Sequence, residues 1–192
     1  MYILELSGSV KQKNVNGCIW QNKLNHLFPN MKTNRHNYTL ELNWTGNTGD
    51  STSSYSSYER SYIIQTENKS QLEGSSDPVF RGDSSKYNPE ELFLAAVSSC
   101  HMLWYLHLCS EEGILVKTYQ DKPEGRMSLN SNGSGQFDKI TLKPKITIGN
   151  SSSEMLKKAE RLHEKANEMC FIANSCNFEI VHEPVVSFLT SS

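Results

Sequence analysis

Apolar and polar residues alternate between residues 36 and 44, where regular structure is expected to begin. This period of two is typical of a strand with one buried face, and its apolar members are Tyr38, Leu40, Leu42 and Trp44. A stretch rich in Gly, Ser, Thr, Asn and Asp follows at 45–54, and residues 57–67 indicate a returning strand. The pattern predicts a hairpin, followed by a long polar connection over residues 68–87.

A helix is predicted from residue 88 to 113. Asn88 is a preferred N-cap, Pro89 fits the first helical position, and Gly113 is a natural stop. No Lys, Arg, Asp or Glu occurs between Leu92 and Leu108. This run contains two serines and two histidines and is shorter than the ~20 residues that a bilayer requires, so it predicts a buried core helix.

Shorter elements are predicted after this helix. Strand-like segments occur at 114–121, 125–130, 135–149 and 177–186, with turns at 123–125 and 131–133. Residues 151–170 form an amphipathic helix in this interpretation, opened by a capping box of Ser151 and Glu154. Its apolar face comprises Met155, Ala159, Leu162, Ala166, Met169 and Cys170.

This order of elements predicts an α+β fold in a single domain over residues 35–192. Residues 1–34 lack a sustained period, so we expect a loosely attached N-terminal extension there. Met31 directly precedes the ordered part, and we regard it as a candidate biological start.

Composition excludes several classes of protein. Hydrophobic residues make up 36% of the chain and charged residues 21%, which is typical of a globular protein. The formal net charge is -2, and no block of Lys and Arg occurs. We therefore expect no nucleic-acid partner and no membrane association.

Five cysteines occur, at positions 18, 100, 109, 170 and 176, without a CxxC pair. This spacing favours neither a zinc ribbon nor a thioredoxin motif. The opening residues lack the basic and apolar regions of a secretory signal, so we expect a cytoplasmic protein with reduced thiols.

The spacing of the cysteines limits which thiols can meet. Cys109 lies nine residues beyond Cys100, about half a rotation and ~13 Å along one helix, so the two cannot form a disulfide. Cys170 ends the apolar face of the second helix and can meet Cys100, while Cys176 can pair with either thiol. By burial alone, Cys100 would be an unreactive apolar residue.

Two segments carry a family resemblance: NPEELFLAAVSSCH at 88–101 and CFIANS at 170–175. They resemble the two signature segments of the OsmC/Ohr superfamily, and the resemblance extends from about residue 36 to 184. It implies antiparallel sheets packed around a long buried central helix, a second amphipathic helix and an intertwined homodimer.

The resemblance also implies a thiol peroxidase that reduces organic hydroperoxides to alcohols. Cys100 would attack the peroxide and become a sulfenate, and Cys170 would convert the sulfenate to a disulfide. A dithiol, in this family a lipoyl group, would then reduce the disulfide. Cys176 is the alternative resolving thiol, and the resemblance implies no cofactor or metal.

A thiolate needs a cation or hydrogen-bond donor nearby, and in the family an arginine held by the glutamate of NPE fills this role. The glutamate corresponds to Glu90. We favour Arg60 as the arginine, with Arg81 as the alternative. Ten residues of helix place Glu90 ~15 Å from Cys100 of the same chain, so we expect Glu90 of the partner subunit to serve Cys100.

Apolar neighbours of Cys100 would favour fatty or aryl peroxides, and the candidates are Phe93, Met102, Leu103, Trp104 and Phe171. One rival hypothesis is a metal site, with candidate ligands Cys100, His101, Cys170 and His163. Adjacent residues on a helix point ~100° apart, which disfavours this site. The second rival is a non-catalytic member of the family that binds a small apolar ligand.

Overall fold

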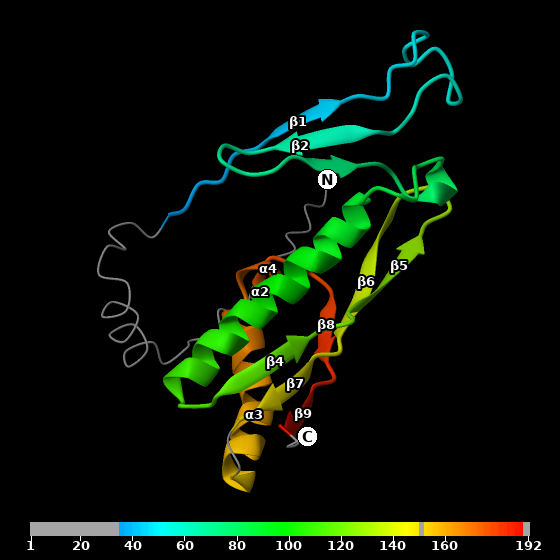
Figure 1. The fold of residues 1–192 in the computed structure, drawn as a ribbon. Helices are drawn as coiled ribbons and strands as arrows, with labels where there is room; N and C mark the ends of the chain where they lie inside the picture. The colour runs from blue at the N-terminus through cyan, green and yellow to red at the C-terminus, as the bar shows by residue number, and fades with distance from the viewer. Residues whose placement is uncertain (1–34, 150–151, 190–192) are drawn as a thin grey trace, which may run out of the picture. The chain divides into compact units, whose positions relative to one another are not determined.

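The computed structural model describes residues 35–149 and 152–189, and Figure 1 shows their fold. Glu41–Ser192 form one compact unit, and the described residues before it, 35–40, contain no helix or strand. The predicted extension over residues 1–34, with Cys18 and Met31, lies outside the described residues.

The predicted hairpin is present in a three-stranded antiparallel sheet of order β1-β2-β3. Its strands are β1 (Glu41–Trp44), β2 (Tyr62–Gln65) and β3 (Leu72–Gly74). The alternating segment becomes a strand only at Glu41, five residues later than expected. The segment 68–87 was predicted as a connection, but it contains β3 and the short 3-10 helix η1 (Pro78–Phe80).

Strand β1 does not have the buried face that its alternation predicts. All four of its residues are exposed, with Leu42 at 56% and Trp44 at 44%. The Trp44 indole donates a hydrogen bond to the backbone oxygen of Glu59, at 2.8 Å. The Trp44 ring also contacts Tyr58 edge to face, yet both apolar side chains of β1 keep a large exposed area among the described residues of one chain.

Helix α2 (Pro89–Glu111) confirms the predicted long helix. The Asn88 side chain accepts a hydrogen bond from the Glu91 N–H at 2.8 Å, and the Glu91 carboxylate accepts one from the Asn88 N–H at 3.1 Å. This capping box satisfies two backbone donors at the helix start. Gly113 follows the helix with φ of 68°, a conformation that glycine adopts without steric cost.

One face of α2 is buried and includes Val97, His101, Tyr105, Leu108 and Cys109. That face packs against α3 (Ser153–Met169), while Leu103 remains 63% exposed. By length and composition alone, α2 is the one helix among the described residues that is apolar enough to cross a membrane. It packs against α3, and 28% of its apolar 18-residue window is buried.

Six further strands form two mixed sheets. One has the order β4-β7-β9, made of β4 (Val116–Gln120), β7 (Lys145–Ile148) and β9 (Val185–Phe188). The other has the order β5-β6-β8, made of β5 (Glu124–Leu129), β6 (Gly135–Leu142) and β8 (Glu179–His182). The pairs β6–β8 and β7–β9 are parallel and the other pairs antiparallel, so the α+β class is confirmed with sheets that include parallel pairs.

Two predicted strands are each divided at a proline. The segment 135–149 divides at Pro144 into β6 and β7, and the segment 177–186 divides at Pro184 into β8 and β9. Proline has no N–H to contribute to a ladder, so each strand leaves its sheet there. The two breaks lie side by side, because Glu183 N–H donates to the Leu142 oxygen at 2.8 Å and Val185 N–H donates to the Pro144 oxygen at 2.9 Å.

Helix α3 has Ser152 as its N-cap, with no side-chain capping bond. The predicted capping residue, Ser151, lies outside the described residues. The predicted apolar face is present, and its fully buried members include Ala159 and Ala166, with His163 between them. A short helix, α4 (Phe171–Asn174), follows directly after α3.

Candidate functional site

Two of the predicted site cysteines, Cys100 and Cys170, lie together where α2 meets the junction of α3 and α4. Cys100 is half-buried on α2, whereas Cys170 is fully buried. The two side chains are close enough for Cys100 to contribute to the raised pKa of Cys170. The fold therefore brings together two thiols that are 70 residues apart in the sequence.

The Cys170 sulfur has a defined environment. Cys170 is the N-cap of α4, and its sulfur accepts a hydrogen bond from the Ala173 N–H at 3.4 Å. Burial, followed by the interaction with the Cys100 thiol, raises the pKa of Cys170 to about 12. The Cys170 thiol is thus protonated near neutral pH and can donate to the Cys100 sulfur.

The other described cysteines have different surroundings. Cys109 is buried beside Tyr105, and burial raises its pKa to about 11, so it fits the packing role expected for it. Cys176 is half-buried and donates a hydrogen bond to the backbone oxygen of Ile172 at 3.2 Å. Burial also raises the pKa of Cys176.

An exposed apolar surface surrounds Cys100. Leu103 and Trp104 follow Cys100 by one helical turn, on the same side of α2. Phe171 contacts Trp104 edge to face, with ring centroids 5.6 Å apart, and is 66% exposed. Among the predicted apolar neighbours, Phe93 instead packs against the aromatic rings of the core.

Glu90 lies at the other end of α2, in the first helical turn. Its Oε2 atom is buried and has no hydrogen-bond partner among the described residues. It borders a cleft of about 310 Å³ lined by Pro89, Glu90, Phe93, Met127, Gly135, Gln136, Phe137, Asn177 and Phe178. A buried carboxylate oxygen without a donor is energetically costly, so this atom can accept a bond from a group other than the described residues.

Neither candidate arginine contacts Cys100 or Glu90 within the described part of one chain. The Arg60 guanidinium donates to the backbone oxygens of Tyr58 and Tyr55, at 2.5 and 2.6 Å. It also lies over both tyrosine rings, 4.2 and 4.3 Å from their centroids. Arg81 is exposed and follows η1 with φ of 66°.

Sequence reasoning grouped His101 and His163 only as candidate metal ligands and missed the ring stack that they form with His182 and Tyr105. His101 Nε2 lies 2.9 Å from His163 Nδ1, and His182 stacks on His101 with centroids 4.5 Å apart. Tyr105 stacks on His163 at 3.9 Å. The sequence did indicate that His163 is buried, because it lies between Ala159 and Ala166 on the apolar face of α3.

This stack bears on the metal-site hypothesis. One ring nitrogen of His101 is hydrogen-bonded to one ring nitrogen of His163. Burial lowers the pKa of both histidines to about 3. Within residues 35–149 and 152–189, no group of three or more His, Cys, Asp or Glu side chains is arranged to hold a metal ion. The imidazoles are therefore neutral and hydrogen-bonded to each other.

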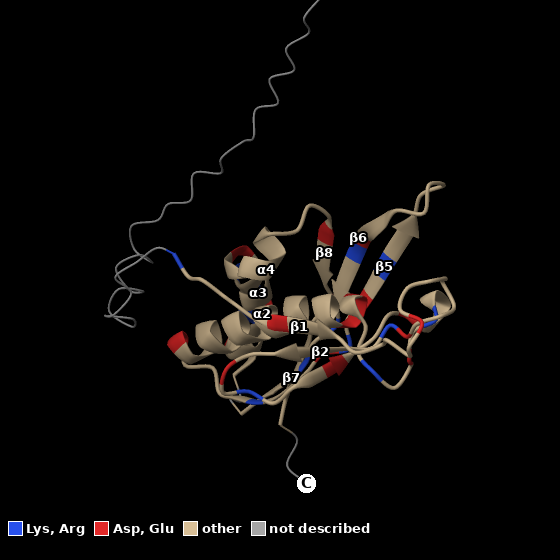
Figure 2. Cartoon of the chain, turned by 90° about the horizontal axis from the view of Figure 1, so that it is seen from above, with Lys and Arg blue, Asp and Glu red and all other residues tan. Residues whose placement is uncertain are grey.

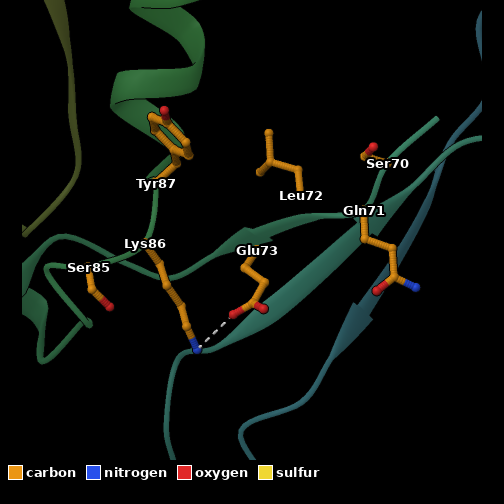
Figure 3. Close-up of a pocket in the computed structure, with 7 residues that line it drawn as sticks. All are labelled: Ser70, Gln71, Leu72, Glu73, Ser85, Lys86 and Tyr87. Atoms are coloured by element: carbon orange, nitrogen blue, oxygen red, sulfur yellow. Dashed lines mark ion pairs between the residues drawn. The ribbon is translucent and has the colours of Figure 1, made fainter.

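A second pocket, of about 570 Å³, lies at β3 and includes none of the predicted site residues (Figure 3). Its lining is Ser70, Gln71, Leu72, Glu73, Ser85, Lys86 and Tyr87, and Lys86 pairs with Glu73 at 3.6 Å. In Figure 2, charged residues on α2 are confined to its two ends. Cys100 therefore lies on the uncharged part of α2, whereas Cys170 lies at the junction of α3 and α4.

The comparison with protein families connects this site to known proteins. The model described as OsmC-like protein matches residues 82–184, which include Glu90, Cys100 and Cys170. The chain belongs to the OsmC-like protein family. The recognition made from NPEELFLAAVSSCH and CFIANS is thereby confirmed.

Other OsmC-like proteins share the fold. An OsmC-like protein of unknown function from Vibrio cholerae superposes with a TM-score of 0.71 at 29% identity, over 79% of this chain and 100% of that chain. An organic hydroperoxide resistance protein from Elizabethkingia anophelis superposes with a TM-score of 0.55 at 19% identity, over 81% and 99%. The uncharacterized protein YmaD of Bacillus subtilis is 24% identical over 142 residues, covering 73% of this chain and 86% of YmaD.

Proposed function

We propose that this OsmC-like protein is a cytoplasmic thiol peroxidase that reduces organic hydroperoxides. The observation that carries the proposal is the proximity of two thiols, half-buried Cys100 on α2 and buried Cys170 at the start of α4. The family membership supports it, and so does the organic hydroperoxide resistance protein that shares the fold.

In the proposed reaction, the Cys100 thiolate attacks the outer oxygen of the hydroperoxide. The O–O bond breaks, the alkoxide takes up a proton and leaves as the alcohol, and Cys100 becomes a sulfenic acid. The Cys170 sulfur then attacks the sulfenic sulfur, and water leaves as the disulfide forms. A dithiol reduces the disulfide, and a lipoyl group is the proposed reductant.

We propose that the active protein is a homodimer. Glu90 is about 15 Å of helix rise from Cys100 of its own chain, and its Oε2 atom is buried without a donor. The uncovered Leu42 and Trp44 of β1 support a subunit interface. Glu90 of the partner subunit would then orient an arginine, proposed to be Arg60, toward Cys100.

The apolar surface beside Cys100 supports organic rather than inorganic peroxide as the substrate. Leu103 and Phe171 each expose more than 60% of their surface, and Trp104 contacts Phe171. The alkyl or aryl group of an organic hydroperoxide would cover these side chains while its peroxide group reaches the sulfur. Hydrogen peroxide has no apolar group that could cover them.

The second candidate function is binding of a small ligand without turnover. The cleft of about 310 Å³ beside Glu90 favours it, because three aromatic rings and one buried carboxylate oxygen converge there. The rings are those of Phe93, Phe137 and Phe178. A ligand for this cleft would combine an apolar body with a hydrogen-bond donor.

One experiment separates the two functions. Reduced protein is mixed with one equivalent of cumene hydroperoxide, and loss of free thiol is followed together with formation of cumyl alcohol. The peroxidase predicts stoichiometric alcohol and loss of the Cys100 thiol, both abolished in Cys100→Ser and retained in Cys109→Ala. Equal thiol loss in wild type and Cys100→Ser would exclude the peroxidase function.

A further inference from the structure

Cys170 and Cys176 stand on either side of helix α4 and bind to one of its peptide groups. The Cys170 sulfur accepts a hydrogen bond from the Ala173 N–H at 3.4 Å, and the Cys176 thiol donates to the Ile172 oxygen at 3.2 Å. The Ile172 carbonyl and the Ala173 N–H belong to the same planar trans peptide, so they point in opposite directions. A single peptide group therefore separates the two sulfurs.

The two thiols differ in their access to solvent. Cys170 is 0% exposed, whereas Cys176 is only half-buried. In a disulfide between Cys100 and Cys170, an external dithiol could attack only the half-buried Cys100 sulfur, because Cys170 is fully buried. Cys176 lies on the other side of α4 from the Cys170 sulfur and is more accessible to a reductant.

We propose that Cys176 is a second resolving thiol. It displaces Cys100 from the Cys100–Cys170 disulfide and forms a new disulfide with Cys170. The external dithiol then reduces a Cys170–Cys176 disulfide. This inference rests on the proposed peroxidase function and adds a step between resolution and reduction.

The step is a thiol–disulfide exchange. The Cys176 thiolate attacks the Cys170 sulfur, a Cys170–Cys176 bond forms, and the Cys100–Cys170 bond breaks. Cys100 leaves as a thiolate, and the proton lost by Cys176 passes to water. One disulfide replaces another, so the exchange needs no oxidant or reductant.

Helix α4 must unwind for this exchange. The Cys170 and Cys176 sulfurs bind opposite ends of one peptide group inside α4, so these bonds must break before the two sulfurs can meet at the close spacing of a disulfide. The structure that must unwind is a helix of only four residues. Its backbone bonds within this segment run from Asn174 N to Cys170 O, from Ser175 N to Ile172 O and from Cys176 N to Ala173 O.

Unwinding would also activate the attacking thiol. In the intact helix, burial raises the pKa of Cys176, and its proton is held by the Ile172 oxygen. Loss of both interactions lowers the cost of forming the thiolate. The movement that brings the Cys176 sulfur to Cys170 thus also makes it a better nucleophile.

Timed disulfide mapping tests this relay. The reduced full-length protein is mixed with one equivalent of cumene hydroperoxide, quenched with N-ethylmaleimide at successive times and analysed by mass spectrometry. We expect the Cys100–Cys170 disulfide first, followed by Cys170–Cys176 with Cys100 again alkylated. In Cys176→Ser the first disulfide should persist, and its reduction by dihydrolipoamide should slow at least about tenfold. Cys109→Ala should behave as wild type.

The possible failures are distinguishable. If the Cys100–Cys170 disulfide is the final wild-type product and Cys176→Ser is reduced at the wild-type rate, the relay is wrong and the peroxidase stands. If wild-type Cys100 does not react with the peroxide, the proposed function and the relay are both wrong. Disulfide mapping of the wild-type protein alone shows whether Cys100 reacts and which disulfide is the final product, so the test does not depend on the folding of a variant.

Discussion

His101 on α2 and His163 on α3 form a buried pair, with Nε2 of His101 2.9 Å from Nδ1 of His163. The hydrogen bond joins the two longest helices of the described chain, beside Cys100. His182 of β8 stacks on His101, and Tyr105 stacks on His163. Burial disfavours the charged form of each imidazole, so the interior of this site is held together by neutral rings.

Acid should destabilise the fold through this pair. Burial lowers the pKa of His101 and His163 to about 3, below the ~6.5 of an unfolded chain, so the unfolded state binds more protons as the pH falls. The free energy of unfolding should therefore decrease from pH 6.5 downward, by about 2 kcal/mol per histidine at pH 5. The contribution of His182 has the same sign, although Asp121 opposes the lowering of its pKa.

Urea unfolding between pH 7.5 and 4.5 measures this dependence. His163→Gln removes one titrating group, so its stability should fall less steeply with acid than that of wild type. A pH-independent stability of the wild-type protein over this range would contradict a buried neutral pair.

Subunit mixing tests whether Glu90 serves the partner subunit. Cys100→Ser and Glu90→Gln homodimers should both be inactive with cumene hydroperoxide. Unfolding and refolding an equal mixture makes half of the dimers mixed, and each mixed dimer has one intact Cys100 facing one intact Glu90 of the partner subunit. Activity should recover to about a quarter of wild type. If Glu90 serves its own Cys100, no activity returns.

Leu42 and Trp44 should contribute to the same dimer. Both side chains lie uncovered on β1, and a charge placed there would be buried at an apolar interface. Leu42→Glu should therefore shift the protein toward monomer in sedimentation velocity, whereas Leu129→Glu, at another exposed leucine, should leave the dimer intact. An unchanged oligomeric state in Leu42→Glu would exclude β1 from the interface.

The two arginines can be separated by the reactivity of Cys100. The activating arginine stabilises the thiolate, so its removal should raise the pH at which iodoacetamide alkylates Cys100 and slow peroxide reduction about a hundredfold. We expect this for Arg60→Ala and little change for Arg81→Ala. The reverse result would assign the role to Arg81 and leave Arg60 as a support for Tyr55 and Tyr58 in the hairpin.

The capping box of α2 should contribute stability without contributing to the reaction. Asn88→Ala removes the acceptor for the Glu91 N–H and should cost about 1 kcal/mol in urea unfolding. Asn88→Asp keeps the acceptor and should restore most of that loss. Neither change should alter the rate at which Cys100 reacts with peroxide in folded protein.

Several elements could be predicted because their causes are local. Asn88, Pro89 and Gly113 define the limits of α2 through contacts within a few residues, and the bounds of α2 lie within two residues of the prediction. The buried face of α3 follows from helical spacing alone. The signature segments also identified the family, because short motifs around Glu90, Cys100 and Cys170 carry that information.

Other features depend on partners distant in the sequence. The breaks at Pro144 and Pro184 become visible only when Val185 N–H meets the Pro144 oxygen, and strand alternation does not reveal whether β6 pairs in parallel with β8. Strand β1 has the pattern of a buried face, but burial depends on a covering surface that one chain does not supply among its described residues.

The sequence by itself determined the long helix, the family and Cys100 as the candidate nucleophile, because capping, helical period and motif are properties of neighbouring residues. Only the tertiary structure decided that the Cys170 thiol contacts Cys100, that Arg60 is bound by two tyrosines, and that His101 meets His163. The histidines are 62 residues apart, and such contacts arise from the packing of whole helices, which no local pattern records.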